Sequence, residues 1–170
     1  MLEFLQIHRI TEEDCGEDQM SVLEIKKAGD PVLKEVAKPV AKIDRKVKQL
    51  IDDMLETMYA ADGVGLAAPQ VGISRRIIVI DAGEGPLELI NPEIVEKEGT
   101  ELGTEGCLSV PGYFGEVERF AKVTVEGLNR MGKKVQISGE GLLGRALQHE
   151  IDHLEGVLFI ERAQSLSRKV

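Results

Sequence analysis

Two histidines spaced four residues apart are the residues of this chain best suited to chemistry. They lie in the run His149-Glu150-Ile151-Asp152-His153. On a helix, residues four apart share one face, so both imidazoles can reach one metal ion. Glu150 follows the first of them and is placed to accept a proton from water at that metal. The run therefore predicts a catalytic metal site with Glu150 as general base; two surface histidines on a polar helix face are the alternative.

A catalytic metal site of this kind needs a third protein ligand and an open position. Cys107 is the best candidate, because Gly106 before it permits close backbone approach. The other histidine of the chain, His8, lies in an N-terminal segment unlike the rest. The alternative for Cys107 is a small buried hydrophobic residue. We expect Cys107, His149 and His153 to bind one metal ion.

The segment GVGLAAPQ at residues 63–70 combines small residues with an amide donor. Its glycines and alanines let another group approach the backbone closely, and Gln70 supplies the donor. It is no dinucleotide fingerprint, since no strand precedes it, and it lacks the Gly-Lys-Ser/Thr ending of a phosphate loop. Taken alone, the segment is also consistent with a packed turn.

Two helices are predicted to hold these segments. The first has Asp44 as its N-cap, carries apolar residues at three- and four-residue steps, and ends at Asp62-Gly63. The methionines on its apolar face are expected to fill the core. The second follows Gly141, contains the two histidines and stops near Gly156.

Between the helices the sequence predicts short strands. The β-branched run 77–80 is typical of a strand buried on both faces. Residues 87–90 and 93–97 indicate two weaker strands separated by Asn91-Pro92, and alternation on both sides of residues 129–132 indicates a hairpin. The order of helix, many strands and helix favours an α+β domain. We expect short, mostly antiparallel strands packed around a central metal-binding helix.

Composition and charge limit the classes of function. The 170 residues fit one domain, and 42% hydrophobic with 30% charged residues is an ordinary globular mixture. A formal charge of −9 argues against direct binding of nucleic acid or anionic membranes. Two cysteines make no disulfide framework, and no apolar segment approaches a membrane span or a signal peptide. We expect a cytoplasmic protein.

Residues 1–20 differ from the rest of the chain, being polar and acidic without an apolar period. We predict a disordered leader or an artificial extension there, with a short ordered arm as the alternative. Residues 21–170 are predicted to form a single catalytic domain.

Together, the three segments resemble the peptide deformylase family. The resemblance is carried by GVGLAAPQ at 63–70, EGCLS at 105–109 and QHEIDH at 148–153, in the family's order and without a departure, and it extends from about residue 22 to about residue 162. It implies a metal-dependent hydrolase that removes the formyl group from the formyl-methionine of new proteins and releases formate. Residues 1–20 have no counterpart in the family.

The resemblance also implies roles for individual residues. Metal-bound water attacks the formyl carbon, with Glu150 as general base and then general acid. Gln70 and the backbone N–H of Leu108 donate hydrogen bonds to the formyl oxygen. The methionine pocket is expected to be apolar and to be lined by a small set of residues near the two outer motifs. These are Val64, Gly65, Leu142, Ala146 and Arg145, the last with its stem at the pocket mouth and its charged head in water.

The expected cofactor and partners follow from the same resemblance. The divalent ion is Fe²⁺ in the cell, with Zn²⁺, Ni²⁺ or Co²⁺ able to replace it, and the substrates are nascent formyl-methionyl polypeptides. Some relatives dock on the ribosome through a C-terminal helix. Here only residues 161–170 remain for that helix, and Arg162, Arg168 and Lys169 are the cations that a transient ribosome contact would use. A frayed, solvated end is the alternative.

Two other interpretations remain open for the motif taken alone. A helical His-Glu-x-x-His pair also fits a zinc endopeptidase, although a cysteine third ligand and the small size count against it. A structural zinc site would need a fourth protein ligand, for which the chain offers no candidate after residue 20.

Overall fold

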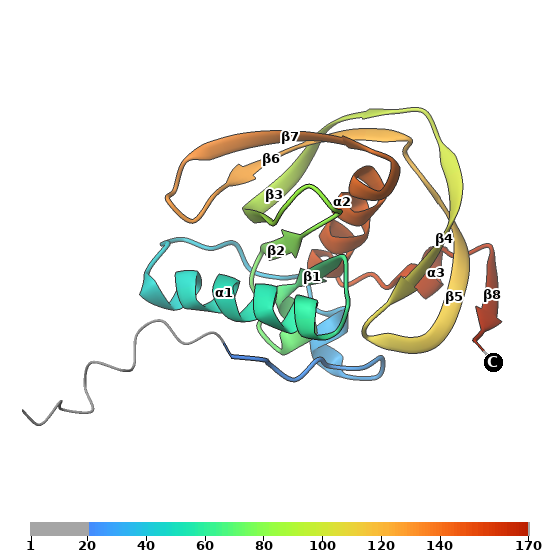
Figure 1. The fold of residues 1–170 in the computed structure, drawn as a ribbon, viewed down its shortest axis with the longest axis horizontal. Helices are drawn as coiled ribbons and strands as arrows, with labels where there is room; N and C mark the ends of the chain where they lie inside the picture. Colours follow the sequence, from blue (N-terminus) through green and yellow to red (C-terminus); the bar gives the residue numbers. More distant parts are fainter. Residues whose placement is uncertain (1–20, 170) are drawn as a thin grey trace, which may run out of the picture.

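The computed structural model describes residues 21–169, which form two antiparallel sheets around a central helix (Figure 1). The larger sheet has the strand order β1-β2-β3-β6-β7 and the smaller one β4-β5-β8. The predicted α+β class with antiparallel strands around the metal-binding helix is confirmed. The elements are η1 Pro31–Lys34, α1 Arg45–Ala60, β1 Gly65–Ala67, η2 Ala68–Val71, β2 Ile77–Ile80, β3 Leu87–Glu98, β4 Glu101–Cys107, β5 Val110–Arg119, β6 Lys122–Leu128, β7 Lys134–Glu140, α2 Gly141–Leu154, α3 Phe159–Arg162 and β8 Ser165–Arg168.

Strand β2 lies between the two long helices. Ile78 and Ile80 pack in the core under α2, whereas Ile77 and Val79 pack in the core under α1. This alternation confirms the prediction of a strand buried on both faces, because successive side chains point to opposite sides.

Helix α1 begins and ends where its sequence signals predict. The Asp44 side chain accepts a hydrogen bond from the Val47 N–H at 3.0 Å, and Asp62 leaves the helix with a φ of 55°. Met54 and Met58 are fully buried, as expected of core residues. The helix thereby ends beside β1, where the small-residue motif begins.

Strand β3 differs from the prediction, which divided it in two at Asn91-Pro92. It runs continuously through both residues, with register shifts against β6 between Ile90 and Glu93 and again after Ile94. Asn91 adopts a φ of 53° and exchanges hydrogen bonds with the backbone of Val40 at 2.8 and 3.0 Å. The irregular pairing at this point accommodates Pro92, because proline has no N–H to donate to a regular hydrogen-bond ladder.

Helix α2 is fixed against the β6–β7 hairpin, which forms where the sequence predicts it. The approach is so close that a Cβ at Gly144 would lie 2.6 Å from the carbonyl oxygen of Gly139. The helix ends near Gly156, which has a φ of 75°. A glycine at each of these places lets the histidine-bearing helix pass through the middle of the fold.

The C-terminal segment is neither the helix nor the frayed end that the sequence suggests. After the single turn of α3, β8 pairs antiparallel with β5 from Tyr113↔Arg168 to Glu116↔Ser165. β4 covers the other edge of β5, so β8 satisfies backbone groups that would otherwise form an open edge.

Within residues 21–169, the helices are too short or too polar to cross a membrane. The predicted leader at residues 1–20 lies outside the described residues.

Candidate metal centre

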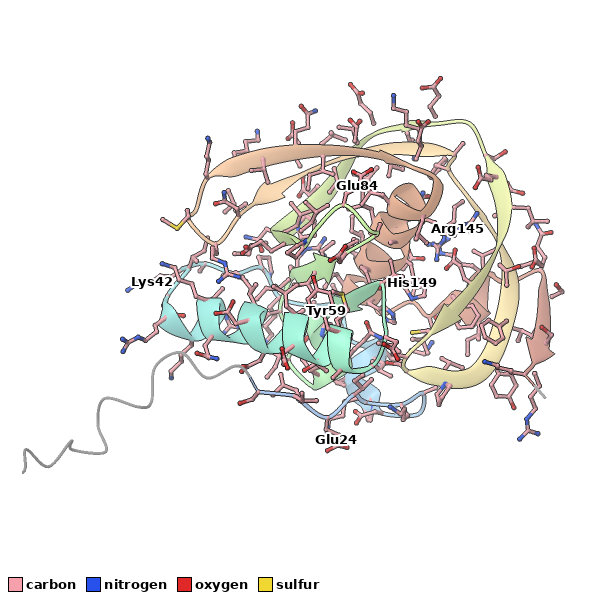
Figure 2. The ribbon with its side chains drawn as sticks, viewed as in Figure 1. Glu24, Lys42, Tyr59, Glu84, Arg145 and His149 are labelled. Carbon is pink, nitrogen blue, oxygen red and sulfur yellow. The ribbon has the colours of Figure 1, made fainter. Side chains whose placement is uncertain are left out.

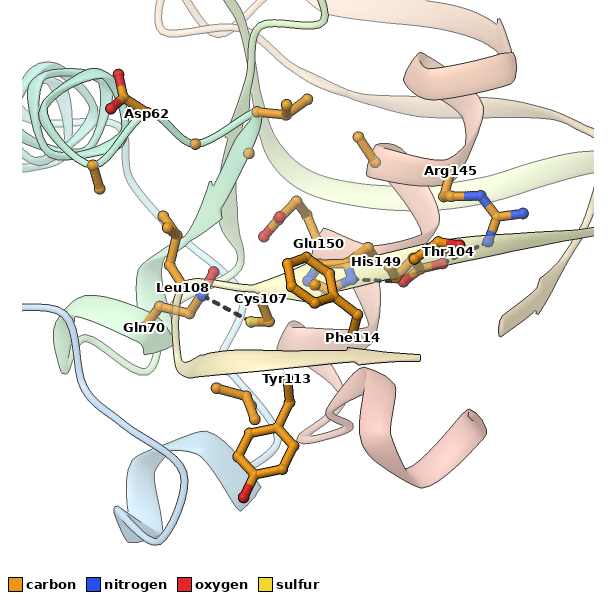
Figure 3. Close-up of a pocket in the computed structure, with 18 of the residues that line it drawn as sticks. Asp62, Gln70, Thr104, Cys107, Leu108, Tyr113, Phe114, Arg145, His149 and Glu150 are labelled. Atoms are coloured by element: carbon orange, nitrogen blue, oxygen red, sulfur yellow. Dashed lines mark hydrogen bonds and ion pairs between the residues drawn. The ribbon is translucent and has the colours of Figure 1, made fainter. Parts of the chain in front are cut away.

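One helix face and one strand end bring the predicted metal ligands together, and Figure 3 shows two of them, Cys107 and His149. α2 presents His149 and His153, whose ring centroids lie 5.0 Å apart, and β4 ends at Cys107. The Cys107 Sγ lies 3.4 Å from the His153 Nε2. One ligand atom of each residue lies within 4.8 Å of the others.

The donor set and its spacing fit a small divalent ion. Metal–sulfur and metal–nitrogen bonds of about 2.3 and 2.1 Å in tetrahedral geometry place S and N donors about 3.5 Å apart. The 3.4 Å between Cys107 and His153 agrees with this spacing. The cavity beside the cluster is lined by Cys107 and His149, so it provides space for a further ligand on that side.

The two imidazoles experience opposite electrostatic surroundings. Burial lowers the pKa of His153 well below its usual value, so this ring stays neutral, as a ligand must. Burial also opposes charge on His149, but hydrogen bonds to Cys107 and Glu105 outweigh it and raise its pKa to about 10. The acceptors around His149 therefore stabilise a cation at this ring, and a metal ion bound at Nε2 would take the place of the proton.

Glu105 orients His149 through the ring nitrogen that faces away from the cluster. The sequence motifs did not predict this contact. The His149 Nδ1 lies 2.8 Å from the Glu105 Oε1, which leaves Nε2 to face the cluster. Arg119 donates to both oxygens of Glu105, at 2.8 and 2.9 Å. Burial would raise the pKa of Glu105, but the hydrogen bonds from Arg119 and His149 lower it below its usual range. A buried carboxylate thus orients the ring of His149, one of the predicted ligands.

A sequence signal for Glu105 exists, whereas none exists for Arg119. Glu105 lies two residues before Cys107 in β4, so strand alternation places both on one face. Arg119 ends β5 and bridges Glu105 to Asp152 of α2, which is a long-range contact.

Arg145 makes contacts that the sequence did not predict. Its side chain lines the cavity and is 12% exposed, and its guanidinium is bonded to groups of the protein. The guanidinium donates to the Glu105 Oε2 at 2.7 Å and to the carbonyls of Val117 and Glu101. The buried carboxylate of Glu105 draws the cation inward, because a buried charge needs partners.

Replacing Arg145 with Met should lower metal affinity or kcat/KM by about tenfold. Replacing a residue that supports a metal ligand costs about 10–100-fold in affinity or activity. The loss should be at the lower end of this range because Arg119 still neutralises Glu105. Metal titration and steady-state kinetics measure the effect. Arg145→Lys should recover part of the loss. Arg162→Met is the control, because Arg162 is half exposed and bonds Asp152 instead. Equal behaviour of the Arg145 and Arg162 variants would contradict a role through Glu105.

Glu150 lies beside the cluster with one oxygen available. The residue is 3% exposed, and within the described chain its Oε2 has no hydrogen-bond partner. Burial raises its pKa to about 7, which suits a group that takes up and returns a proton near neutral pH. A Cβ at Gly65 would lie 2.7 Å from the Glu150 Oε1, so the glycine leaves the space that the carboxylate occupies.

Gln70 joins the small-residue motif to the cysteine motif. Its side chain is buried, and its Oε1 accepts a hydrogen bond from the Ala67 N–H at 3.0 Å. Its Nε2 donates to the Ser109 Oγ at 3.1 Å and lies 3.5 Å from the Cys107 Sγ. The contact with the sulfur directs one N–H of the amide toward the cluster.

A cavity of about 590 Å³ opens over these groups. It is lined by all the residues predicted for the substrate pocket, namely Val64, Gly65, Leu142, Arg145 and Ala146, and by Gln70, Leu108 and Glu150. Tyr113, Phe114 and Lys169 line it as well, which the sequence motifs did not indicate. In Figure 3, the Tyr113 ring points away from the ligand cluster.

These features define a metal-dependent hydrolase, because three protein donors lie close together beside a cavity that is also lined by a buried carboxylate. A sequence model of the family described as Polypeptide deformylase matches residues 22–169. The chain belongs to the peptide deformylase family and is an enzyme that removes the N-terminal formyl group from polypeptides. The endopeptidase and structural-zinc alternatives are thereby set aside.

Individual relatives agree with this assignment. The peptide deformylase of Halothermothrix orenii is 61% identical over 153 residues, which cover 89% of this chain and 99% of that protein. That of Carboxydothermus hydrogenoformans is 58% identical over 150 residues, covering 88% and 99%. The crystal structure of the peptide deformylase from Thermotoga maritima superposes with a TM-score of 0.83 at 51% identity, covering 85% of this chain and 99% of that one.

Proposed function

We propose that Cys107, His149 and His153 hold the metal and that Glu150 transfers the protons of deformylation. The observation that carries this proposal is the buried, unpartnered Oε2 of Glu150 beside the ligand cluster at the cavity. When bound there, a divalent ion supplies Lewis acidity that polarises the formyl carbonyl and acidifies water. The catalytic domain is proposed to comprise residues 21–170.

The proton transfers are assigned to one carboxylate. Glu150 takes a proton from the attacking water at Oε2 as the carbon–oxygen bond forms. It then returns the proton to the amine nitrogen as the carbon–nitrogen bond breaks, which releases formate and a free N-terminal methionine. Its raised pKa supports both steps, since the group exchanges a proton easily near neutral pH.

The negative charge that develops on the formyl oxygen is stabilised by two donors. We assign these to the Gln70 Nε2 and the backbone N–H of Leu108, which flank Cys107 from η2 and from the turn after β4. The contact between the Gln70 Nε2 and the Cys107 Sγ, at 3.5 Å, supports this assignment, because it places the amide donor beside the ligand cluster.

The methionine side chain is assigned to the apolar part of the cavity. Val64, Leu142 and Ala146 provide apolar wall, and Gly65 leaves room for substrate beside Glu150. The methylene groups of Arg145 complete the apolar wall of the cavity, while its guanidinium donates a hydrogen bond to Glu105.

A formyl peptide should be cleaved at least about a hundredfold better than the same peptide with an acetyl group. The formyl carbon carries only hydrogen, whereas an extra methyl in a packed site costs roughly 1–3 kcal/mol, and each 1.4 kcal/mol or so is tenfold in rate. The acetyl carbonyl is also less electrophilic. Measuring kcat/KM for both forms of one methionyl tripeptide tests this, and comparable values would contradict a selective deformylase.

We infer that the native ion is Fe²⁺ and that Zn²⁺, Ni²⁺ or Co²⁺ can replace it. A thiolate donor favours softer divalent ions, which supports this set. Activity in air should then decline faster for the iron form than for the nickel form of the same protein, because ferrous iron beside a thiolate is open to oxidation. Equal lifetimes in one buffer would contradict the iron assignment.

We propose that the enzyme acts in the cytoplasm, in transient contact with the ribosome, because its substrates are nascent formyl-methionyl polypeptides. Among the tail cations that the sequence suggests for such a contact, Arg162 is bonded to Asp152, whereas Arg168 and Lys169 are exposed.

A further inference from the structure

One part of the cavity wall has no role in the proposed reaction. It comes from the smaller sheet, comprises Gly112, Tyr113 and Lys169, and is called the β5–β8 rim here. Figure 3 shows Tyr113 and Asp62 on opposite sides of Cys107. A peptide that is held by its formyl group and its methionine must leave the cavity along one of its walls, and the β5–β8 rim is one of these.

Strand pairing directs the Lys169 side chain toward the cavity. Arg168 is paired with Tyr113 in the antiparallel ladder of β8 and β5, and its guanidinium lies 6.0 Å from the centre of the Tyr113 ring. These two side chains therefore share one face of the sheet. Lys169 follows, and its N–H donates to the Gly112 carbonyl at 2.7 Å, which continues the pairing by one residue. Because successive side chains alternate, Lys169 lies on the opposite face from Arg168, and it lines the cavity.

Among the described residues, Lys169 is the cavity-lining cation whose side chain has no partner. One arginine and one lysine line the cavity, and the arginine, Arg145, points toward the smaller sheet and is bonded to Glu105 (Figure 2). Lys169 is exposed, and within residues 21–169 its ammonium forms no ion pair or hydrogen bond. Of the acids that line the cavity, Glu105 and Glu150 lie at the ligand cluster and Asp62 lies just beyond α1. The ammonium therefore remains available to a carboxylate of the substrate.

The order of strands sets how far the β5–β8 rim lies from the reacting carbon. β5 lies between β8 and β4, and β4 ends at Cys107. Since neighbouring strands are about 4.8 Å apart, β8 lies roughly 10 Å from β4. An extended peptide advances about 3.3 Å per residue, so a substrate with its formyl group at the ligand cluster reaches the rim at about its third or fourth residue.

We propose that Lys169 is a specificity-determining residue that binds the carboxylate of an aspartate or glutamate at the third or fourth position of the substrate. This inference rests on the proposed action on formyl-methionyl peptides and adds a preference among their sequences. The net charge of −9 by itself favours basic peptides, so a preference for acidic ones requires a local cation. The ion pair forms equally in the bound substrate and in the transition state, so it lowers KM and leaves kcat unchanged.

The test compares kcat/KM for formyl-methionyl pentapeptides that differ only in having glutamate, glutamine or lysine at position three or four. At low salt, the wild-type enzyme should cleave the glutamate peptide about two- to fivefold better than the glutamine peptide at one of these positions, the usual strength of an exposed ion pair. The lysine peptide should be the poorest. The difference should vanish as salt approaches about 1 M, where charges are screened beyond about 3 Å.

Variants of two neighbouring cations separate a local contact from net charge. Lys169→Met should remove the preference for the glutamate peptide, and Lys169→Glu should reverse it, so that the lysine peptide is cleaved best. Arg168→Met is the matched control, because it changes the net charge as Lys169→Met does, but Arg168 lies on the other face of the sheet and does not line the cavity. It should keep the wild-type ratio. Both residues are exposed, so the variants should remain folded.

The uncharged glutamine peptides separate this inference from the proposed function. Failure of the wild-type enzyme to cleave them would overturn both. Cleavage of the glutamine peptides without a preference for glutamate at either position would overturn the role of Lys169 alone. Equal loss of the preference in Lys169→Met and Arg168→Met would also overturn it, because the preference would then reflect net charge.

Discussion

Replacing Glu150 with Gln should leave the metal bound and reduce kcat for formyl peptide by about 10²–10⁴-fold, the usual contribution of a positioned general base. The substitution preserves the volume beside Gly65, so the pocket keeps its shape. It leaves the three proposed ligands unchanged and removes only the oxygen that takes the proton. Metal content and steady-state kinetics on the same sample measure both parts of the prediction.

The control for this variant is Glu155→Gln, just after the C-terminal end of α2. Glu155 pairs with Arg76 at the surface and does not line the cavity. Its replacement should leave kcat unchanged. Activity of Glu150→Gln within tenfold of wild type would contradict the assigned role, and loss of the metal would move Glu150 from proton transfer to metal binding.

Cys107→Ser should weaken metal binding. The diluted enzyme should therefore lose its metal and most of its activity. A serine hydroxyl is a poorer donor than a thiolate, and a softer ion depends on the sulfur. In the cobalt-substituted protein, the absorption from thiolate-to-metal charge transfer should disappear. Metal titration and the optical spectrum measure these effects independently of activity.

Cys15→Ser provides the matched control, because the chain contains two cysteines and Cys15 lies outside the family match. That variant should keep the metal, the spectrum and the activity. If Cys107→Ser also kept its spectrum and its metal affinity, Cys107 would not be a ligand.

Local spacing in the sequence was sufficient to predict the helical part of the site. The four-residue step of His149 and His153 places both on one helix face, and Glu150 necessarily follows the first. Capping residues likewise predicted where α1 begins, since the Asp44 bond to Val47 involves neighbours in the chain. Such features depend on the period of one element and need no partner.

The third proposed ligand, Cys107, could be predicted from the sequence only as a candidate. Cys107 and His153 are 46 residues apart, and their contact depends on β4 reaching the last turn of α2. The need of the histidine pair for a third ligand already favoured Cys107, and the resemblance to a family supported the same choice, whereas a buried hydrophobic cysteine remained the alternative. The C-terminal strand was also unpredicted, because β8 forms only where β5 presents an unpaired edge.

The class of fold, the two helices and the types of residue that carry the chemistry can therefore be predicted from the order of residues along the chain. The packed structure decides which residues surround the buried carboxylate of Glu105. These are Arg119, Arg145 and His149. Helical spacing places Arg145 on the cavity side of α2 but does not reveal what faces it. A carboxylate removed from water needs cations and donors from whichever elements surround it, and that set is defined by packing rather than by spacing along the chain.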